Sequence, residues 1–280
     1  MKLATIRTLD GRTRAVRVED DRLVDLGTSD LGALLADRDW AERAAVAAGP
    51  VAGSRGATFA PVVPAPGKIV CVGLNYRNHI LEMGRDLPEF PTLFAKYADT
   101  LVGATDDIVK PPETTGFDWE CELAVIIGAP VRRARGAGAE RAIAGFAVFN
   151  DITCRDWQFR TREWLQGKNW ESTTPLGPYL VTPDELPGGV RPVLEITTRI
   201  DGETVQKDTT GDMVFEPVAL VEYVSTMVTL RPGDVIATGT PGGVGHAREP
   251  VRYLEVGQRL TTEIAGLGRC DNRVVAEPGT

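Results

Sequence analysis

The hydrophobic pattern of the chain consists mainly of short stretches that are apolar or alternate between apolar and polar residues. Turn-forming residues lie between these stretches. Residues 2–26 alternate in strand fashion, and Asp10-Gly11 interrupts them with a turn signal. Further short apolar runs lie at 68–73, 93–96, 124–127, 145–149 and 235–238. Runs of this length with β-branched members are typical of buried strands. The pattern therefore predicts a protein built mainly of β-strands.

Two hairpins are expected in the second half of the chain. The runs 194–200 and 203–206 flank Asp201-Gly202, a strong hairpin signal. The runs 258–264 and 269–275 flank a loop with two glycines and predict a closing hairpin.

Few segments have helical periodicity. Residues 216–228 predict an amphipathic helix with Leu220, Tyr223, Val224 and Met227 facing inward. Thr153 can cap a second helix, which places Arg155, Gln158 and Arg162 on roughly one side. Shorter helices are expected at 75–83 and 140–144. The expected class is mainly β with a few helices (α+β).

The stretch from Gly49-Pro50 to Pro66-Gly67 is rich in proline, glycine and small residues, which is typical of a boundary. We place the division near residue 60. A small β-rich N-terminal domain then covers residues 1–60, and a larger catalytic domain covers residues 61–280.

Composition and charge narrow the function. Over 280 residues, 31 basic and 39 acidic side chains give a net charge of −8, which argues against nucleic-acid binding. An acidic protein that binds an acidic substrate needs a local positive centre, and a metal ion supplies one. Four cysteines without a C-x-x-C pair and two histidines make structural zinc unexpected. No apolar signal core or membrane-length run is present, so a cytoplasmic protein with no membrane partner is expected.

Residues 118–127 contain two closely spaced glutamates followed by an apolar run. On a strand, Glu120 and Glu122 project to the same face, because residues two apart share a face. Two ionised carboxylates so placed repel each other, and burying them unpaired is costly. A divalent cation such as Mg²⁺ or Mn²⁺ would resolve this conflict, since both prefer oxygen ligands. The alternative is an edge strand with both glutamates in water.

Two further stretches could carry chemistry. His79 and Glu82 lie three residues apart and would be neighbours on a helix, either as a general base with its orienting carboxylate or as a surface pair. The loop 239–245 is rich in glycine but lacks the endings of nucleotide-binding motifs. Its amides and the Thr240 hydroxyl could instead hold a small carboxylate.

Several short motifs occur along the chain in the same order as in a known protein family. They are N-Y-x-x-H-x-x-E, D-W-E-x-E-L, N-D-x-x-x-R-D-x-Q, G-K and G-T-P-x-G-V-G, and they lie within residues 68–275. This arrangement resembles the fumarylacetoacetate hydrolase family. The resemblance implies a mixed β-sandwich roll and a homodimer.

The resemblance also implies roles for individual residues. Glu120, Glu122 and Asp151 match the ligands of Mg²⁺ or Mn²⁺. His79 and Glu82 match the catalytic dyad, and Lys168 matches the lysine beside the metal.

Other matches concern the substrate. Gln158, Thr240 and Arg155 correspond to substrate contacts, whereas Cys154 stands where relatives often carry alanine. Arg85, Lys96 and Arg162 are candidates for binding a second carboxylate.

The expected substrate is a small 2-oxo or 2,4-dioxo acid. We expect hydrolysis of a carbon–carbon bond in an acylpyruvate-like or fumarylacetoacetate-like acid, giving pyruvate or a related 2-oxo acid, because the His79–Glu82 dyad can activate water. Decarboxylation of an oxaloacetate-like acid is an alternative, as is isomerisation or decarboxylation of a hydroxymuconate-type dienol in aromatic catabolism. A binding protein without turnover is a remote alternative.

Overall fold

The computed structural model of the chain describes residues 1–20, 22–50, 56–82, 84 and 86–279, and it does not describe the side chains of His79 and Glu82. The protein is mostly β with a few helices, in mixed sheets, as predicted. The helices are α1 (Leu31–Leu35), α2 (Trp40–Val46), α3 (Arg77–Glu82), α4 (Ala137–Glu140), α5 (Arg155–Gln158), α6 (Leu165–Lys168), α7 (Pro217–Met227) and the 3₁₀ turn η4 (Gly245–Ala247).

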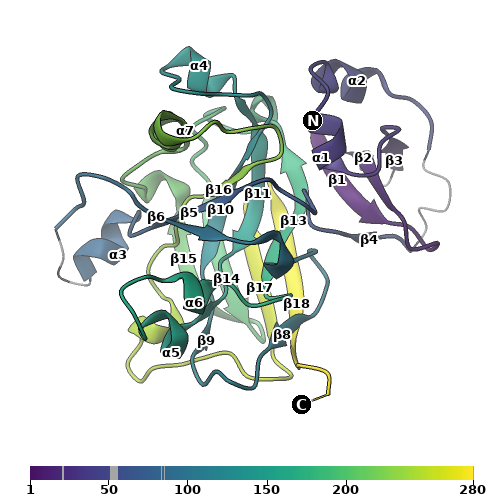
Figure 1. The fold of residues 1–280 in the computed structure, drawn as a ribbon. Helices are drawn as coiled ribbons and strands as arrows, with labels where there is room; N and C mark the ends of the chain where they lie inside the picture. Colours follow the sequence, from purple (N-terminus) through teal and green to yellow (C-terminus); the bar gives the residue numbers. More distant parts are fainter. Residues whose placement is uncertain (21, 51–55, 83, 85, 280) are drawn as a thin grey trace.

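Strands account for most of the regular structure (Figure 1). They are β1 (Lys2–Arg7), β2 (Thr13–Glu19), β3 (Arg22–Asp25), β4 (Thr58–Phe59), β5 (Ile69–Gly73), β6 (Thr92–Lys96), β7 (Leu101–Val102), β8 (Ile108–Lys110), β9 (Phe117–Asp118), β10 (Cys121–Ile127), β11 (Ile143–Asn150), β12 (Thr153–Cys154), β13 (Thr174–Val181), β14 (Glu195–Ile200), β15 (Glu203–Thr209), β16 (Val235–Ala237), β17 (Arg259–Ile264) and β18 (Gly268–Ala276).

The largest sheet has the strand order β3-β2-β1-β13-β11-β10-β16-β5-β6. Strand β10 lies near its middle, antiparallel to both β11 and β16, whereas β16 and β5 are parallel. A second sheet has the order β15-β14-β17-β18-β8, and β12 pairs with β9. Both predicted hairpins are confirmed, as β14–β15 and β17–β18.

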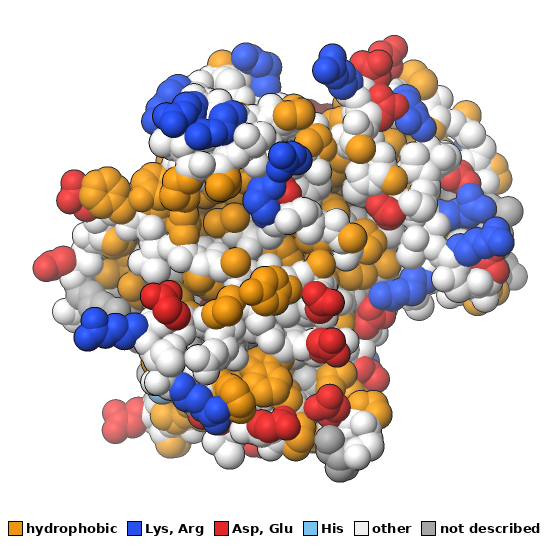
Figure 2. All heavy atoms as spheres, viewed as in Figure 1, with side chains coloured by type: hydrophobic (Ala, Val, Ile, Leu, Met, Phe, Trp, Pro, Cys, Tyr) orange, Lys and Arg blue, Asp and Glu red, His pale blue; other side chains and the backbone are white. Residues whose placement is uncertain are grey.

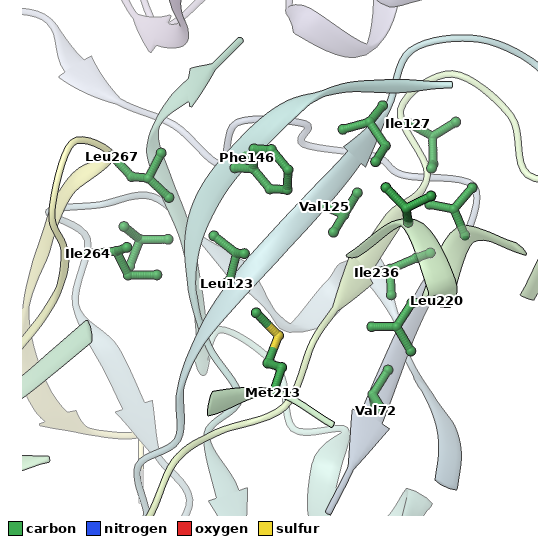
Figure 3. Packing of buried hydrophobic residues seen from close by; sticks show 14 of the residues in the cluster. Val72, Leu123, Val125, Ile127, Phe146, Met213, Leu220, Ile236, Ile264 and Leu267 are labelled. Atoms are coloured by element: carbon green, nitrogen blue, oxygen red, sulfur yellow. The ribbon is translucent and has the colours of Figure 1, made fainter. Parts of the chain in front are cut away.

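Both faces of β10 are buried, which explains its continuous apolar sequence. Leu123, Val125 and Ile127 belong to a core that also includes residues of α7 and of the second sheet (Figure 3). Ala124 and Ile126 point the other way, into a core that includes the leucines of α1. The alternation follows from the two-residue period of a strand. It fixes β10 firmly between two packed layers.

The N-terminal strands join the large sheet directly. Strand β1 pairs antiparallel with β13 through Lys2↔Val181 and Leu3↔Leu180, and β4 pairs with β1. Figure 1 shows β1–β3 at one side of the molecule together with α1 and α2. The division into two domains at residue 60 stays a prediction.

Some helix predictions need correction. Residues 217–227 form α7 and bury Leu220 and Val224, but Met227 is 52% exposed because it ends the helix. The helix expected at 140–144 lies earlier, at Ala137–Glu140, because Ile143 already begins β11. Arg162 lies outside α5, which ends at Gln158, and it is exposed. Thr153 does not cap α5 and donates its hydroxyl to the Asp151 carbonyl at 2.8 Å.

On the face that Figure 2 shows, basic side chains gather over the region of α4, and acidic side chains predominate in the lower half. Within the described part of the chain, no helix is long and apolar enough to cross a membrane.

Candidate metal centre

Three carboxylates meet where β10 begins and β11 ends. The two strands are antiparallel with Cys121 opposite Asn150, so Glu120 and Glu122 lie beside Asp151. The Asp151 amide donates to the Glu120 carbonyl at 2.8 Å, which ties the two strand ends together. One oxygen from each of the three carboxylates lies within 4.8 Å of the others. The sequence predicted this group, and its ligand role is proposed below.

All three side chains are buried: Glu120 is 8% exposed, Glu122 1% and Asp151 0%. The alternative of a solvated edge strand is therefore wrong. It fails because β10 has neighbours on both sides and its faces are covered by two cores.

Two lysines and an arginine neutralise part of this negative charge. The Lys168 Nζ lies 2.7 Å from both Glu120 Oε2 and Asp151 Oδ2. The Lys96 Nζ lies 2.7 Å from Asp151 Oδ1, and an Arg155 nitrogen lies 2.7 Å from Glu120 Oε1. Lys96 therefore does not extend toward a substrate, contrary to one expectation, because its ammonium group is buried against Asp151.

Glu122 is the carboxylate without a cationic partner among the described residues. Its Oε2 accepts the Gly239 amide at 2.8 Å. Burial raises the pKa of Glu122 well above its usual range, and the charges of Asp151 and Glu120 add to this effect. The buried group as a whole has four carboxylates (Asp118, Glu120, Glu122, Asp151) and three cations (Lys96, Arg155, Lys168). With all four carboxylates ionised, one negative charge would be left over, which a proton or a cation at Glu122 can balance.

This donor set fits a divalent cation. Carboxylate oxygens are the ligands that Mg²⁺ and Mn²⁺ prefer, and an ion here would compensate the charge of Glu122 when that side chain ionises. Glu120, Glu122 and Asp151 are the residues that would hold it.

Lys168 owes its position to a close contact between two short helices. It ends α6, and Gly167 precedes it. A Cβ at residue 167 would lie 2.5 Å from the Gln158 Cβ in α5, so only glycine permits this approach. Burial alone would lower the pKa of Lys168, but the carboxylates of Asp151 and Glu120 raise it above its usual value. These carboxylates therefore favour the charged form of Lys168.

The glycine-rich loop closes another side of the site. Gly239 has φ +92°, and a Cβ there would lie 2.9 Å from the Val72 carbonyl. The Thr240 hydroxyl donates to the Cys121 carbonyl at 2.9 Å and accepts from the Gln206 Nε2 at 2.9 Å. Gln206 was missed from the sequence, because nothing local shows that β15 reaches this loop.

Arg155 links the site to Asp118. Its Nε lies 2.7 Å from Asp118 Oδ2, and its Nη1 donates to Gln158 Oε1 at 3.0 Å. Burial would lower the pKa of Arg155, but Asp118 and Glu120 raise it above its ordinary value. Both Arg155 and Gln158 are buried, so the predicted substrate contacts sit on a rigid wall.

A cavity of about 140 Å³ opens beside the carboxylates. A cavity of roughly 150 Å³ accommodates a molecule the size of benzene, so this one suits a small acid. Its lining includes predicted site residues and apolar side chains: Glu120, Glu122, Arg155, Gln158, Lys168, Thr240, Val72, Phe94, Phe159, Trp164 and His246.

His246 is a polar lining residue for which the sequence analysis offered no role. It follows the G-T-P-x-G-V-G motif directly, so its place beside that loop was the available signal. By contrast, the predicted dyad of His79 and Glu82 lies in α3 with side chains outside the described part of the chain, as does Arg85.

Comparisons with known proteins agree on one family. A family model described as "Fumarylacetoacetate (FAA) hydrolase C-terminal" matches residues 68–275. A mitochondrial oxaloacetate tautomerase of Homo sapiens is 43% identical over 237 residues, which are 84% of this chain and 75% of that protein.

Solved structures are similar over most of the chain. A fumarylacetoacetate hydrolase from Exiguobacterium antarcticum has a TM-score of 0.85 and 31% identity, covering 99% of this chain and 100% of its own. A fumarylpyruvate hydrolase from Pseudomonas aeruginosa, solved with Mn²⁺ and pyruvate, has a TM-score of 0.68 and 34% identity. That likeness covers 76% of this chain and 91% of the hydrolase.

Proposed function

The chain belongs to the fumarylacetoacetate hydrolase family, and on this premise we propose that it is a Mg²⁺- or Mn²⁺-dependent enzyme that enolises a small 2-oxo acid of the oxaloacetate class. The observation that carries the proposal is the group of three buried carboxylates with Lys168 beside it, at the wall of a small cavity. The likeness to an oxaloacetate tautomerase supports the substrate class.

The residues suit stabilisation of an enolate. A divalent cation, when bound, would act as a Lewis acid toward the carboxylate and oxo oxygens of the substrate. Enolisation removes a proton from C3 and delivers one to the oxo oxygen, while the C3–H electrons form the C2–C3 double bond. Lys168 places a fixed positive charge beside the oxygen that becomes negative. His79, with Glu82, stays a predicted general base, and in this reaction we assign it the proton at C3.

A tautomerase assay tests the proposal. The enol form of oxaloacetate absorbs in the ultraviolet, so its conversion to the ketone can be followed directly. With Mn²⁺, the protein should accelerate the conversion at least about 100-fold, the size of effect expected of charge stabilisation. Treatment with EDTA should remove the acceleration and Mn²⁺ should restore it. Equal rates with and without EDTA would overturn the metal-dependent mechanism.

Hydrolysis of an acylpyruvate is the second candidate, supported by the likeness to a fumarylpyruvate hydrolase that was solved with Mn²⁺ and pyruvate. Here the oxygen of water bonds to the distal carbonyl carbon. The C3–C4 bond breaks, its electrons form the pyruvate enolate, and a proton returns to C3. Release of pyruvate from an acylpyruvate, lost in His79→Ala, would favour this reaction over simple enolisation. The decarboxylase and isomerase alternatives, the homodimer and the cytoplasmic location stay predictions.

A further inference from the structure

His246 stands at the cavity on a loop that is fixed from behind. The backbone amides of Gly245 and His246 donate to Asp118 Oδ1 and Oδ2 at 2.7 and 2.9 Å. A Cβ at residue 245 would lie 1.9 Å from the Arg252 carbonyl oxygen, so glycine is required for this close contact. The same Asp118 carboxylate holds Arg155. The loop is therefore fastened to the segment that leads into the metal ligands.

The His246 ring is also held. The Phe159 ring lies with its centroid 5.0 Å away, and the Tyr253 ring is nearly parallel to the imidazole at 16°. The Tyr253 hydroxyl lies 2.9 Å from His246 Nδ1. Within the described part of the chain, Nε2 has no hydrogen-bond partner. One ring nitrogen is thus used to orient the imidazole, and the other is left for a ligand.

Three other polar side chains of the cavity wall, Arg155, Lys168 and Thr240, already have partners. Arg155 makes contacts with Asp118, Glu120 and Gln158. Lys168 is held between two carboxylates. Gln158 accepts from Arg155 through its Oε1, and its Nε2 has no hydrogen-bond partner among the described residues. Val72, Phe94 and Trp164 make the rest of the wall mainly apolar. A ligand that extends from the carboxylate cluster therefore meets two side chains with an unpaired nitrogen, Gln158 and His246.

We propose that His246 recognises the far end of the substrate, with Nε2 contacting a carboxylate or carbonyl oxygen beyond the 2-oxo acid group. The inference rests on the proposed function, which places the 2-oxo acid group at Glu120, Glu122 and Asp151. The site then prefers 2-oxo acids with a second polar end over aliphatic ones.

Tyr253 acts in this arrangement as a positioning residue. When its hydroxyl donates to Nδ1, the proton of a neutral imidazole resides on Nε2, which becomes a donor toward the substrate. Partial burial and the Arg155 guanidinium lower the pKa of His246 against the opposing effect of Asp118, which favours the neutral ring. A neutral N–H recognises a carbonyl as well as a carboxylate.

Two ligands that differ only at the far end test the proposal. Oxamate has the 2-oxo acid-like group alone, and N-oxalylglycine adds a distal carboxylate. Calorimetry with Mn²⁺-loaded protein should show N-oxalylglycine binding at least about tenfold tighter than oxamate, the size of one good polar contact. His246→Phe keeps an aromatic ring beside Phe159 but has no nitrogen. It should bring the two affinities within about twofold of each other, through loss of one contact, and leave oxamate binding unchanged.

Other outcomes separate the failure of this inference from that of the proposed function. If oxamate binds both proteins and His246→Phe keeps the preference, or wild type shows none, the role of His246 is wrong and the proposed function stands. If Mn²⁺-loaded wild type binds neither ligand, the proposed function fails and the inference falls with it.

A second variant tests the proposal in case His246→Phe does not fold. Tyr253→Phe keeps the ring but removes the hydroxyl at Nδ1, so it should weaken the preference for N-oxalylglycine and leave oxamate binding unchanged. An unchanged preference would count against the proposal. Tyr223→Phe, on α7 and outside the cavity lining, serves as the matched control and should match wild type.

Discussion

The ammonium nitrogen of Lys96 lies 2.7 Å from Asp151 Oδ1, and neither side chain is exposed to solvent. Lys168 occupies the other oxygen of the same carboxylate. Burial raises the pKa of Asp151, but Lys168 and Lys96 outweigh it and hold the pKa below its ordinary value. Asp151 is thus an anion fixed from two sides.

Replacing Lys96 by Met should destabilise the protein by about 3 kcal/mol, because removing one partner of a buried ion pair leaves an uncompensated charge. Urea unfolding at pH 7 measures the loss. Lys207→Met is the matched control: Lys207 pairs with Glu195 at 3.1 Å on the surface, so its loss should cost less than about 0.5 kcal/mol. Equal stabilities of the two variants would contradict a structural role for Lys96.

The same pair predicts a dependence on acidity. The pKa of Asp151 is lowered in the folded state. Its ionised form therefore contributes its full stability above pH 3.8, which is the pKa of the group in the unfolded chain. That contribution is lost as the pH falls through the lower folded pKa. The stability gap between wild type and Lys96→Met should therefore be constant near neutral pH and shrink below about pH 4. If the stability difference between the two proteins instead grew as the pH falls, the pKa of Asp151 would be raised in the folded state and not lowered.

Glu122→Gln should weaken Mn²⁺ binding at least about 100-fold, because losing an outer-shell partner of a metal site already costs about 10- to 100-fold and Glu122 is a proposed direct ligand. In the absence of metal, the same variant should be at least as stable as wild type at pH 8, because Glu122 is buried beside two carboxylates and lacks a cationic partner among the described residues. Calorimetry and urea unfolding measure the two effects. Glu171→Gln, at an exposed position, should change neither.

Metal binding should release protons. The raised pKa of Glu122 keeps this side chain protonated in metal-free protein from its ordinary value of 4.5 up to the raised one. A ligand carboxylate must be ionised, so Mn²⁺ affinity should increase as the pH rises through that window. Titration in two buffers with different ionisation enthalpies counts the protons released. Identical heats in both buffers would show that Glu122 is already ionised.

Lys168→Met should reduce turnover without preventing metal binding. The three carboxylates remain, so Mn²⁺ binding should persist. The turnover number for enol-oxaloacetate should fall about 100-fold or more, because a preorganised charge beside the developing anion is lost. Steady-state kinetics give the result, with Lys207→Met as a surface control. Unchanged turnover would exclude Lys168 from the reaction.

The three carboxylates of the site could be predicted from the sequence for a physical reason. Glu120, Glu122 and Asp151 lie at ends of apolar strands, and the family resemblance implied that the three carboxylates bind one ion. Lys96 was placed in the correct strand, β6, but with the wrong partner. Strand order puts β6 four strands from β11, and no local pattern shows that the Lys96 side chain nevertheless reaches Asp151.

Long-range contacts explain the other gaps. Gln206 reaches Thr240 across 34 positions, and Asp118 reaches the His246 amide across 128. Neither pairing leaves a periodic trace in the sequence. Met227 was misassigned because the periodic pattern continues to the end of α7, where the core no longer covers it.

The buried cations of the site also bear on how the protein matures. Lys96, Lys168 and Arg155 satisfy Asp151 and Glu120 before any ion arrives, and a proton suffices for Glu122. Small zinc domains, in contrast, stay unfolded until their metal binds. On the proposed function, this chain would complete its fold while metal is scarce and load the ion afterwards, so the supply of metal would control its activity without controlling its abundance.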